Sequence, residues 1–311
     1  MERDATLDAE DRRYEPYAPA IPEGVPRTAR TWTWEGWQVH VERVGSPDAP
    51  VRLLLIHGAG GNAAALWPFA AHLAACGAEV TVVDLPGYGR TRPVGRQPIL
   101  YAGWQRLLVD LVEAEHDDRP LLAVGASMGG MLAVDTAAVS GRVSRVVATC
   151  LLDATRPEVR AAVVRAPWLA TLGIPVLRRV PGALARLRVP VRWIAPMRAI
   201  SNHPGLTAEV LRDRRGGGGT MPLRWFRDFL EAGPVVRPEA YDGPPVLLVH
   251  PGEDRWTPPG LSTDFLASLP VPTRYVTLAG CGHFPVEEPG FSTLLDEVRA
   301  EIQLALGGRP D

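Results

Sequence analysis

The stretch LLAVGASMGGMLAV (Leu121–Val134) decides the fold, because its character changes in the middle. It begins as an apolar run typical of a buried strand and ends as a small-residue pattern typical of a helix. Ser127 lies at the junction, with Gly125 and Gly129 two positions to either side. A strand that turns directly into a helix strains the residue at the turn, crowds its neighbours and lifts its side chain clear of the sheet. The pattern therefore predicts an exposed serine nucleophile on a strand–turn–helix element.

Strands and helices are predicted to alternate on both sides of this element. This alternation favours right-handed crossovers and a mostly parallel sheet. The predicted elements are a hairpin around Glu35 and Gly36, strands over 51–57, 79–83, 121–126, 145–151, 244–250 and 273–280, and helices over 63–77, 104–116, 128–139, 260–269 and 291–306.

The alternation of strands and helices stops between about residues 154 and 240. This stretch carries 15 arginines against six acidic residues, and it contains the run Gly216–Gly219, which suggests either a hinge or a plain flexible loop. No strand–helix unit is visible there, so we predict a mainly helical cap over 154–240. The predicted core is 31–153 together with 241–311, and residues 1–30 form an N-terminal extension.

A serine hydroxyl needs a base, and the base needs a carboxylate that orients it. When the nucleophile lies on a strand–turn–helix element of this kind, called a nucleophile elbow, the expected order along the chain is serine, acid, histidine. The acid and the histidine are then expected in loops after later strands. Asp254 follows the strand over 244–250, and His283 follows the next strand. Glu253 and Asp153 are the weaker alternatives for the acid. Ser127, Asp254 and His283 are therefore the predicted catalytic residues.

A glycine-rich loop after the strand over 51–57 suggests an oxyanion hole. Small residues at this place allow a backbone N–H to approach the developing negative charge. Ala59 is the preferred first donor, with Gly60 as the alternative, and the N–H of Met128 is the expected second donor. Asp84 lies in the loop DLPGYGRT (residues 84–91). We expect this loop to form a turn beside the site, and we do not expect Asp84 to be the catalytic acid.

Composition narrows the class of protein. The chain has 311 residues and a net charge of −2, which gives no overall electrostatic argument for nucleic acid. Three cysteines without metal-ligand spacing predict reduced thiols and a cytoplasmic location, and Cys281 is not expected to be a second nucleophile. The expected partner is a small hydrophobic ester, with a homodimer as an open alternative; stable membrane insertion is not expected.

Together these motifs resemble the α/β-hydrolase superfamily, most closely its monoacylglycerol lipase and lysophospholipase branch. They are also similar to hydrolases that cleave C–C bonds in aromatic ring-fission products. The resemblance implies an α/β fold with a mostly parallel eight-stranded sheet, a Ser-His-Asp triad and a helical cap inserted after the sixth strand. One departure is Ala126, which stands where those branches often have His or Asn.

The predicted reaction is hydrolysis of carboxylic esters with a hydrophobic acyl or alkyl part, without a metal or an organic cofactor. C–C bond, thioester or amide hydrolysis on the same triad remains an alternative, as does a non-catalytic ligand-binding member of the fold. Cap residues predicted to bind substrate are Trp168, Trp193, Met197, Trp225 and Phe226, with Leu169, Leu172 and Phe229 as further candidates.

Overall fold

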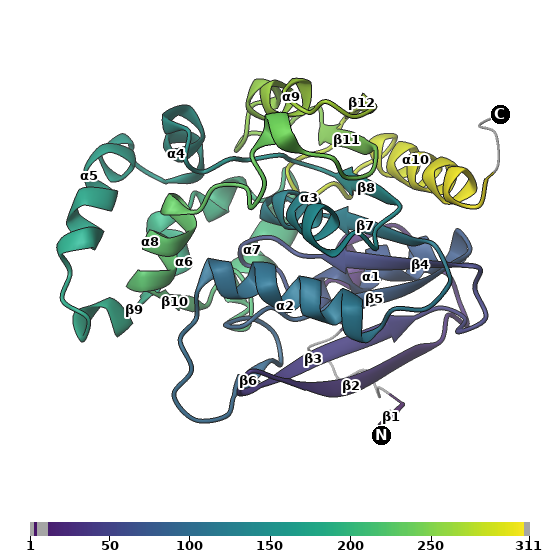
Figure 1. Ribbon diagram of the computed structural model, residues 1–311, viewed down its shortest axis with the longest axis horizontal. Helices are drawn as coiled ribbons and strands as arrows, with labels where there is room; N and C mark the ends of the chain where they lie inside the picture. The colour runs from purple at the N-terminus through teal and green to yellow at the C-terminus, as the bar shows by residue number, and fades with distance from the viewer. Residues whose placement is uncertain (1–2, 5–11, 308–311) are drawn as a thin grey trace.

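The computed structural model describes residues 3–4 and 12–307 (Figure 1). The strands are β1 (Arg3–Asp4), β2 (Arg27–Trp34), β3 (Trp37–Val44), β4 (Val51–Ile56), β5 (Ala78–Val83), β6 (Arg92–Pro93), β7 (Leu121–Gly125), β8 (Arg145–Ala148), β9 (Arg188–Pro190), β10 (Thr220–Pro222), β11 (Val246–Pro251) and β12 (Thr273–Leu278). The helices are α1 (Ala63–Ala75), α2 (Tyr101–Ala114), α3 (Met128–Ser140), α4 (Pro157–Val163), α5 (Pro167–Arg179), α6 (Val191–Ile194), α7 (Pro204–Arg212), α8 (Leu223–Glu231), α9 (Pro259–Ala267) and α10 (Gly290–Ala305), with 3₁₀ turns at Glu15–Tyr17, Leu184–Arg186, Met197–Ala199 and Pro238–Ala240.

One twisted sheet organises the core. Its strand order is β1-β2-β3-β5-β4-β7-β8-β11-β12, with the short β6 paired to β3. All pairs from β5 onward are parallel, whereas β2, β3 and β5 pair antiparallel. Apart from the two-residue β1 and β6, this is the predicted mostly parallel eight-stranded sheet, so the predicted fold class is confirmed.

Burial of the central strands follows from helices on both faces of the sheet. Every residue of β4, β5, β7 and β11 is buried, as their continuous apolar runs predict. Helix α1 packs with α10, and α2 packs with α3. The antiparallel β2–β3 pair closes through a two-residue turn in which Glu35 and Gly36 both have positive φ, the conformation that matches the twist of a hairpin.

The chain leaves the sheet after β8, the sixth of the eight long strands, and returns at β11. Helices α4 to α8 lie in the intervening segment, which forms the left part of the molecule in Figure 1. The segment also contains β9 and β10, an antiparallel pair that the sequence did not predict. The boundaries at 154 and 240 fall between β8 and β11, and the division of the chain into separate domains stays a prediction.

Asp213 joins the cap to the core and to the start of the chain. Its side chain is buried and accepts hydrogen bonds from the Tyr14 hydroxyl at 2.9 Å and from the Asn62 amide at 2.7 Å. Arg13 forms an ion pair with it at 3.1 Å. Because Asn62 caps the N-terminus of α1, this single carboxylate connects three segments that are far apart in the sequence.

The run Gly216–Gly219 follows Asp213 and packs tightly against the core and against α7 of the cap. A Cβ on Gly216 would lie 2.6 Å from the Gly60 carbonyl oxygen, and a Cβ on Gly218 would lie 2.3 Å from the Leu211 carbonyl oxygen. The amides of Gly216 and Gly218 both donate to the Asp213 carbonyl, at 3.0 and 2.9 Å. The glycines are thus required by close backbone approach, a reason that neither the hinge nor the flexible-loop hypothesis had considered.

Among the described residues, no single helix has the length and apolar character needed to cross a membrane. Helix α4 and the Trp168–Arg179 part of α5 pass that test only when taken together, and they meet at a bend of 100°.

Gly216→Ala is expected to lower the free energy of unfolding by roughly 1–3 kcal/mol, because the added methyl group overlaps backbone atoms. Differential scanning calorimetry would detect this as a fall in Tm of several degrees. Gly173→Ala is the matched control, since it lies in α5 with no atom within 4 Å of the added Cβ, and alanine is the better helix former. Equal Tm values for the two variants would contradict the close-packing explanation.

Candidate active site

Ser127 lies in the turn between β7 and α3 and has a strained backbone. Its φ is 55° and its ψ is −122°, and among the described residues only Glu35 shares a positive φ without being glycine. A Cβ on Gly125 would lie 2.1 Å from the Gly129 carbonyl oxygen, and a Cβ on Gly129 would lie 2.3 Å from the Ile56 carbonyl oxygen. The two flanking glycines are therefore sterically required by the turn that exposes the serine.

The structure brings the three predicted catalytic side chains together. The Nε2 atom of His283 lies 2.8 Å from the Ser127 hydroxyl, and its Nδ1 atom lies 2.8 Å from the Asp254 carboxylate. Because a carboxylate only accepts, Nδ1 carries the proton and Nε2 is free to accept from the serine. The His283 side chain is 1% exposed and the Asp254 side chain is 0% exposed.

Asp254 is held by a dense set of donors. Its carboxylate accepts from the Trp256 amide at 2.7 Å, the Thr257 amide at 3.1 Å and the Thr257 hydroxyl at 2.6 Å. Burial raises the pKa of Asp254, but the hydrogen bonds from His283, Thr257 and Trp256 outweigh it and lower the pKa to about 2. The carboxylate is therefore ionised at neutral pH and fixed in place beside the imidazole.

The rival acids have other surroundings. Asp153 accepts two hydrogen bonds from Thr155, at 2.9 Å and 2.6 Å, which close a local turn. Glu253 is exposed, and its carbonyl group accepts from Asn202. The Nδ1–H of His283 donates its hydrogen bond to Asp254 rather than to either rival.

His57 and Asp84 support the loops beside the serine. His57 is buried; its Nε2 accepts from the Leu85 amide at 3.1 Å, so its Nδ1 donates to the Gly58 carbonyl at 2.8 Å. Burial lowers the pKa of His57, which keeps the ring neutral. Asp84 accepts from the amides of Ala63 and Arg90, at 2.7 and 2.6 Å, and thereby holds the start of α1 and its own turn.

The proposed amide donors lie beside Ser127. Ala59 and Met128 line the same pocket as the serine. Met128 is the first residue of α3, so its N–H has no acceptor within the helix. The Ser127 amide is already used, because it donates to the Thr149 hydroxyl at 2.8 Å. The serine turn thus leaves the Met128 N–H available at the positive end of a helix.

Two apolar pockets meet at Ser127, and both include Ala59. One lies under the cap and has a volume of about 610 Å³ including its open mouth; its walls include Leu152, Val191, Ala195, Trp225, Phe226 and Phe229. The other has a volume of about 760 Å³, includes His283, and is enclosed by Phe69, Leu73, Phe284, Leu294 and Val298. No pattern in the sequence had indicated this second pocket.

The placement of the cap residues corrects part of the sequence-based expectation. Trp225 and Phe226 line the pocket under the cap. Trp168, Leu172 and Trp193 do not, since these residues are 61%, 57% and 58% exposed on the outside. Met197 is buried outside this pocket, and its methyl group packs against Gly60 and Gly217. Helical spacing marks apolar residues without saying which of two apolar faces points inward.

Three supporting residues were missed in the sequence. Thr257 and Trp256 hold Asp254, and the Trp256 ring lies 4.7 Å from the His283 ring between centroids. The acid-x-x-Thr-Pro pattern was the available signal for Thr257. Thr149, whose hydroxyl accepts from the serine amide, had no such signal, because it lies directly after β8 and 22 residues further along the chain.

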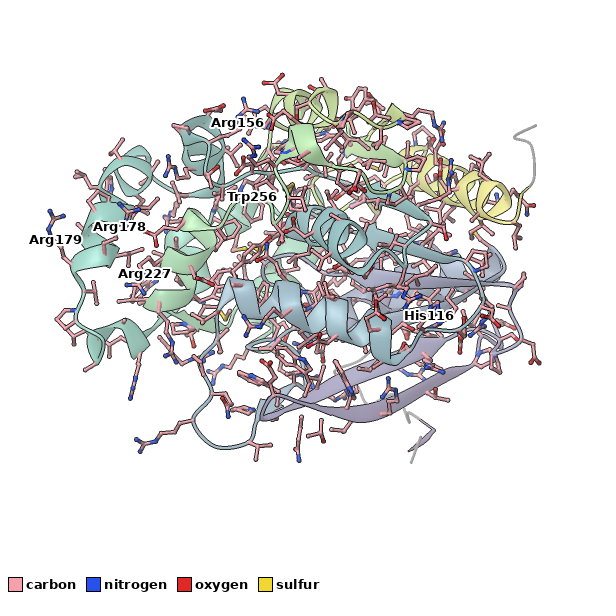
Figure 2. All side chains as sticks on the ribbon, viewed as in Figure 1. His116, Arg156, Arg178, Arg179, Arg227 and Trp256 are labelled. Carbon is pink, nitrogen blue, oxygen red and sulfur yellow. The ribbon has the colours of Figure 1, made fainter. Side chains whose placement is uncertain are left out.

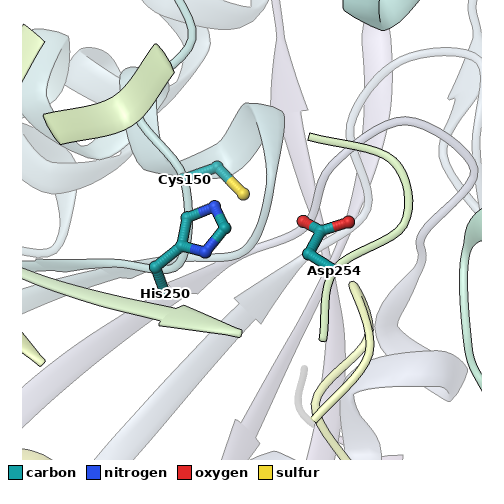
Figure 3. A group of neighbouring side chains, drawn as sticks. All are labelled: Cys150, His250 and Asp254. Atoms are coloured by element: carbon teal, nitrogen blue, oxygen red, sulfur yellow. The ribbon is translucent and has the colours of Figure 1, made fainter. Parts of the chain in front are cut away.

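Cysteine side chains near the site are protonated and structural. Burial raises the pKa of Cys281 to about 12, and its thiol donates to the Glu287 carbonyl. Figure 3 shows Cys150 and His250 beside Asp254, with potential ligand atoms within 4.8 Å of one another. Burial also raises the pKa of Cys150 to about 12, and the Asp254 carboxylate already accepts four hydrogen bonds. This chemistry does not favour a metal ion.

Comparison with solved structures relates the fold to lipases. A soluble variant of monoglyceride lipase from Saccharomyces cerevisiae, in complex with a substrate analog, aligns with a TM-score of 0.70 over 92% of this chain and 96% of that chain, at 17% identity. Monoacylglycerol lipase of Paleococcus ferrophilus aligns with a TM-score of 0.63 over 84% and 98%, at 19% identity. At these low sequence identities, the similarity shows a shared fold.

Sequence comparison agrees. Protein phosphatase methylesterase 1 of Bos taurus is 33% identical over 110 residues, which are 34% of this chain and 28% of that protein. The model of the alpha/beta hydrolase family matches residues 53–291, which run from β4 into α10. The predicted resemblance is thereby confirmed: the chain belongs to the α/β-hydrolase family.

Proposed function

We propose that this protein is a serine hydrolase that cleaves carboxylic esters with a hydrophobic acyl or alkyl part. The observation that carries the proposal is the unbroken hydrogen-bond chain from Asp254 through His283 to Ser127, at the point where two apolar pockets meet. A serine with a strained backbone, hydrogen-bonded to a buried and oriented imidazole, is an arrangement suited to nucleophilic catalysis.

In the first step His283 takes the Ser127 proton at Nε2 while the serine oxygen attacks the ester carbonyl carbon. The carbonyl π electrons move to oxygen and give a tetrahedral oxyanion. The ionised Asp254 stabilises the imidazolium that forms, and it keeps the Nδ1 proton in place throughout.

The oxyanion is stabilised by the N–H groups of Ala59 and Met128. Each such donor contributes on the order of 3 kcal/mol to transition-state stabilisation. Gly60 is the alternative to Ala59. The run Gly216–Gly219, here called the tetraglycine, packs against Gly60 and so holds the glycine-rich loop in place before substrate binds. Donors that are already in position need no rearrangement during the reaction.

Collapse of the oxyanion expels the alcohol, which receives the proton from His283. A water molecule then attacks the acyl-enzyme with His283 as base, releasing the acid and restoring Ser127. Because His283 lines only the second of the two pockets, we assign that pocket to the leaving alcohol and the pocket under the cap to the acyl chain.

An ester is favoured over the other bonds that this machinery cleaves. Protein phosphatase methylesterase 1 and the monoglyceride lipases carry ester cleavage in their names, which supports ester chemistry here. Thioester, amide and C–C bond hydrolysis use the same groups. A panel of matched ester, thioester and amide substrates with the same acyl chain separates these reactions, and the proposal requires the ester to be turned over with a substantial kcat/KM.

Ser127→Ala is expected to reduce ester hydrolysis by several orders of magnitude while leaving the fold intact, because it removes one oxygen atom. Intact mass after treatment with a fluorophosphonate should show one adduct on the wild type and none on the variant. A non-catalytic binding protein would show neither labelling nor turnover in the wild type. Wild-type rates in a clean Ser127→Ala preparation would remove Ser127 from the mechanism.

Asp254→Asn is expected to lower kcat on the order of 10⁴-fold, since the tautomer and the imidazolium both lose their partner. Asp153→Asn is the matched control, because it changes an acid that also follows a strand but whose side chain accepts hydrogen bonds from Thr155 in a local turn. Steady-state kinetics with a p-nitrophenyl ester would measure both. The assignment fails if the Asp153 variant suffers the larger loss.

Ala195→Leu is expected to reduce the ratio of kcat/KM for long over short acyl esters by about tenfold, because it fills space for two or three methylene groups. Trp193→Ala provides the control two positions away, since that side chain points to solvent. Kinetics with p-nitrophenyl esters of increasing acyl length give the ratio for each variant. An unchanged profile in Ala195→Leu would place the acyl chain elsewhere.

A further inference from the structure

The outer face of the cap presents an apolar stripe without a partner among the described residues. Trp168, Leu172 and Val176 of α5 are 61%, 57% and 59% exposed. Their spacing of four residues places them on one side of the helix. The other side is apolar too, since Ile174 is buried in the core. A helix that is apolar all round is normally buried, so the exposed side calls for an explanation.

Further exposed apolar residues follow α5 in the sequence. Among the described residues, eleven large hydrophobic side chains are strongly exposed, and six of them fall within residues 168–193. We name these six the outer cap surface: Trp168, Leu172, Val176, Leu184, Leu187 and Trp193. Concentration of this kind distinguishes an interaction site from the single exposed apolar residues found on any protein.

The same segment is strongly basic. Residues 159–208 contain no aspartate or glutamate and eight arginines, namely Arg160, Arg165, Arg178, Arg179, Arg186, Arg188, Arg192 and Arg198. Figure 2 shows Arg178 and Arg179 on α5 at the outer end of the cap. Arg178 forms an ion pair with Glu231 of α8, but no acid within the segment itself offsets the charge.

We propose that the outer cap surface docks peripherally on an anionic phospholipid membrane. Tryptophan and leucine side chains would enter the boundary between headgroups and acyl chains, while the arginines contact the lipid phosphates. A second copy of this chain fits the surface poorly, because two such faces would bring like charges together. Contact with nucleic acid would satisfy the arginines and leave the aliphatic side chains exposed.

Docking would bring substrate to the site, a consequence that rests on the proposed function. Val191 and Ala195 line the pocket beside Ser127, while Trp193 between them faces outward. The wall of the pocket under the cap is therefore only one short helix thick at this point. A lipophilic ester dissolved in the membrane would have a short path from the bilayer to the nucleophile.

The test measures binding of the wild-type protein to sedimented vesicles of phosphatidylcholine, alone or mixed with phosphatidylglycerol. We expect binding to the mixed vesicles, weakened by high salt. The variant Trp168→Ser/Leu172→Ser/Val176→Ser should bind them at least about tenfold more weakly. Arg179→Gln and Arg186→Gln should each reduce binding to the mixed vesicles by about fivefold.

Val94→Ser/Val139→Ser is the matched control, since these side chains are 53% and 48% exposed on the core and should not affect binding. Hydrolysis of a short, water-soluble ester should be equal in the wild type and the triple serine variant. This readout separates loss of docking from loss of the catalytic machinery, and it also reports whether the variant is folded.

A second measurement follows the fluorescence of the tryptophans of the wild-type protein. Brominated lipids in the mixed vesicles should quench tryptophan fluorescence, and Trp168→Phe/Trp193→Phe should remove most of that quenching. The proposal is overturned if the wild type binds neither vesicle, if the triple serine variant binds as tightly as the wild type, or if quenching persists in the double phenylalanine variant. It is also overturned if the surface instead produces a concentration-dependent dimer that the serine substitutions abolish.

Discussion

The positive φ of Ser127 is the constraint on which the active-site arrangement depends. A strand that ends in the sheet and a helix that starts at once leave the serine no relaxed conformation. The turn is so tight that a Cβ on Gly125 or Gly129 would overlap backbone atoms of α3 or β4. The same turn points the hydroxyl at His283 and leaves the Met128 amide without a helical partner. Strain at one residue thus positions both the proposed nucleophile and one of the two proposed oxyanion donors.

The surrounding loops are held by buried polar groups rather than by apolar packing alone. His57 connects the glycine-rich loop to Leu85, and Asp84 fixes the start of α1. Asp213 extends this network to the cap, because it binds Asn62 and supports the tetraglycine over Gly60. Each of these groups is satisfied where it is buried, which makes the arrangement specific as well as stable. The cap and the glycine-rich loop around Gly60 are consequently joined by one continuous set of contacts.

The cap uses its apolar residues in two directions. Trp225, Phe226 and Phe229 line the pocket beside Ser127, where the Trp225 ring stacks on Phe229 and meets Phe226 edge-on. The residues of the outer cap surface face away from Ser127. A pocket suited to a hydrophobic acyl chain therefore lies close beneath a surface suited to a lipid boundary. Both features come from a segment that lies outside the regular strand–helix alternation, which is where members of a common fold differ in function.

The sequence by itself determined the sheet, the elbow and the positions of Ser127, Asp254 and His283. These features depend on local patterns: buried apolar runs, glycines at fixed offsets and polar residues directly after strands. The sequence also predicted that the loop of Asp84 shapes a turn beside the site, and the Asp84 side chain accepts hydrogen bonds within that turn and at the start of α1. Only the tertiary structure decided which cap tryptophans face inward, that Thr149 holds the serine amide, and that a second apolar pocket adjoins His283. These depend on contacts between segments far apart in the chain, and a periodic pattern carries no information about which neighbour will cover a given face. The tetraglycine is the simplest example. The sequence contains four consecutive glycines, and only the fold explains them, because their backbone packs too closely against Gly60 to leave room for side chains.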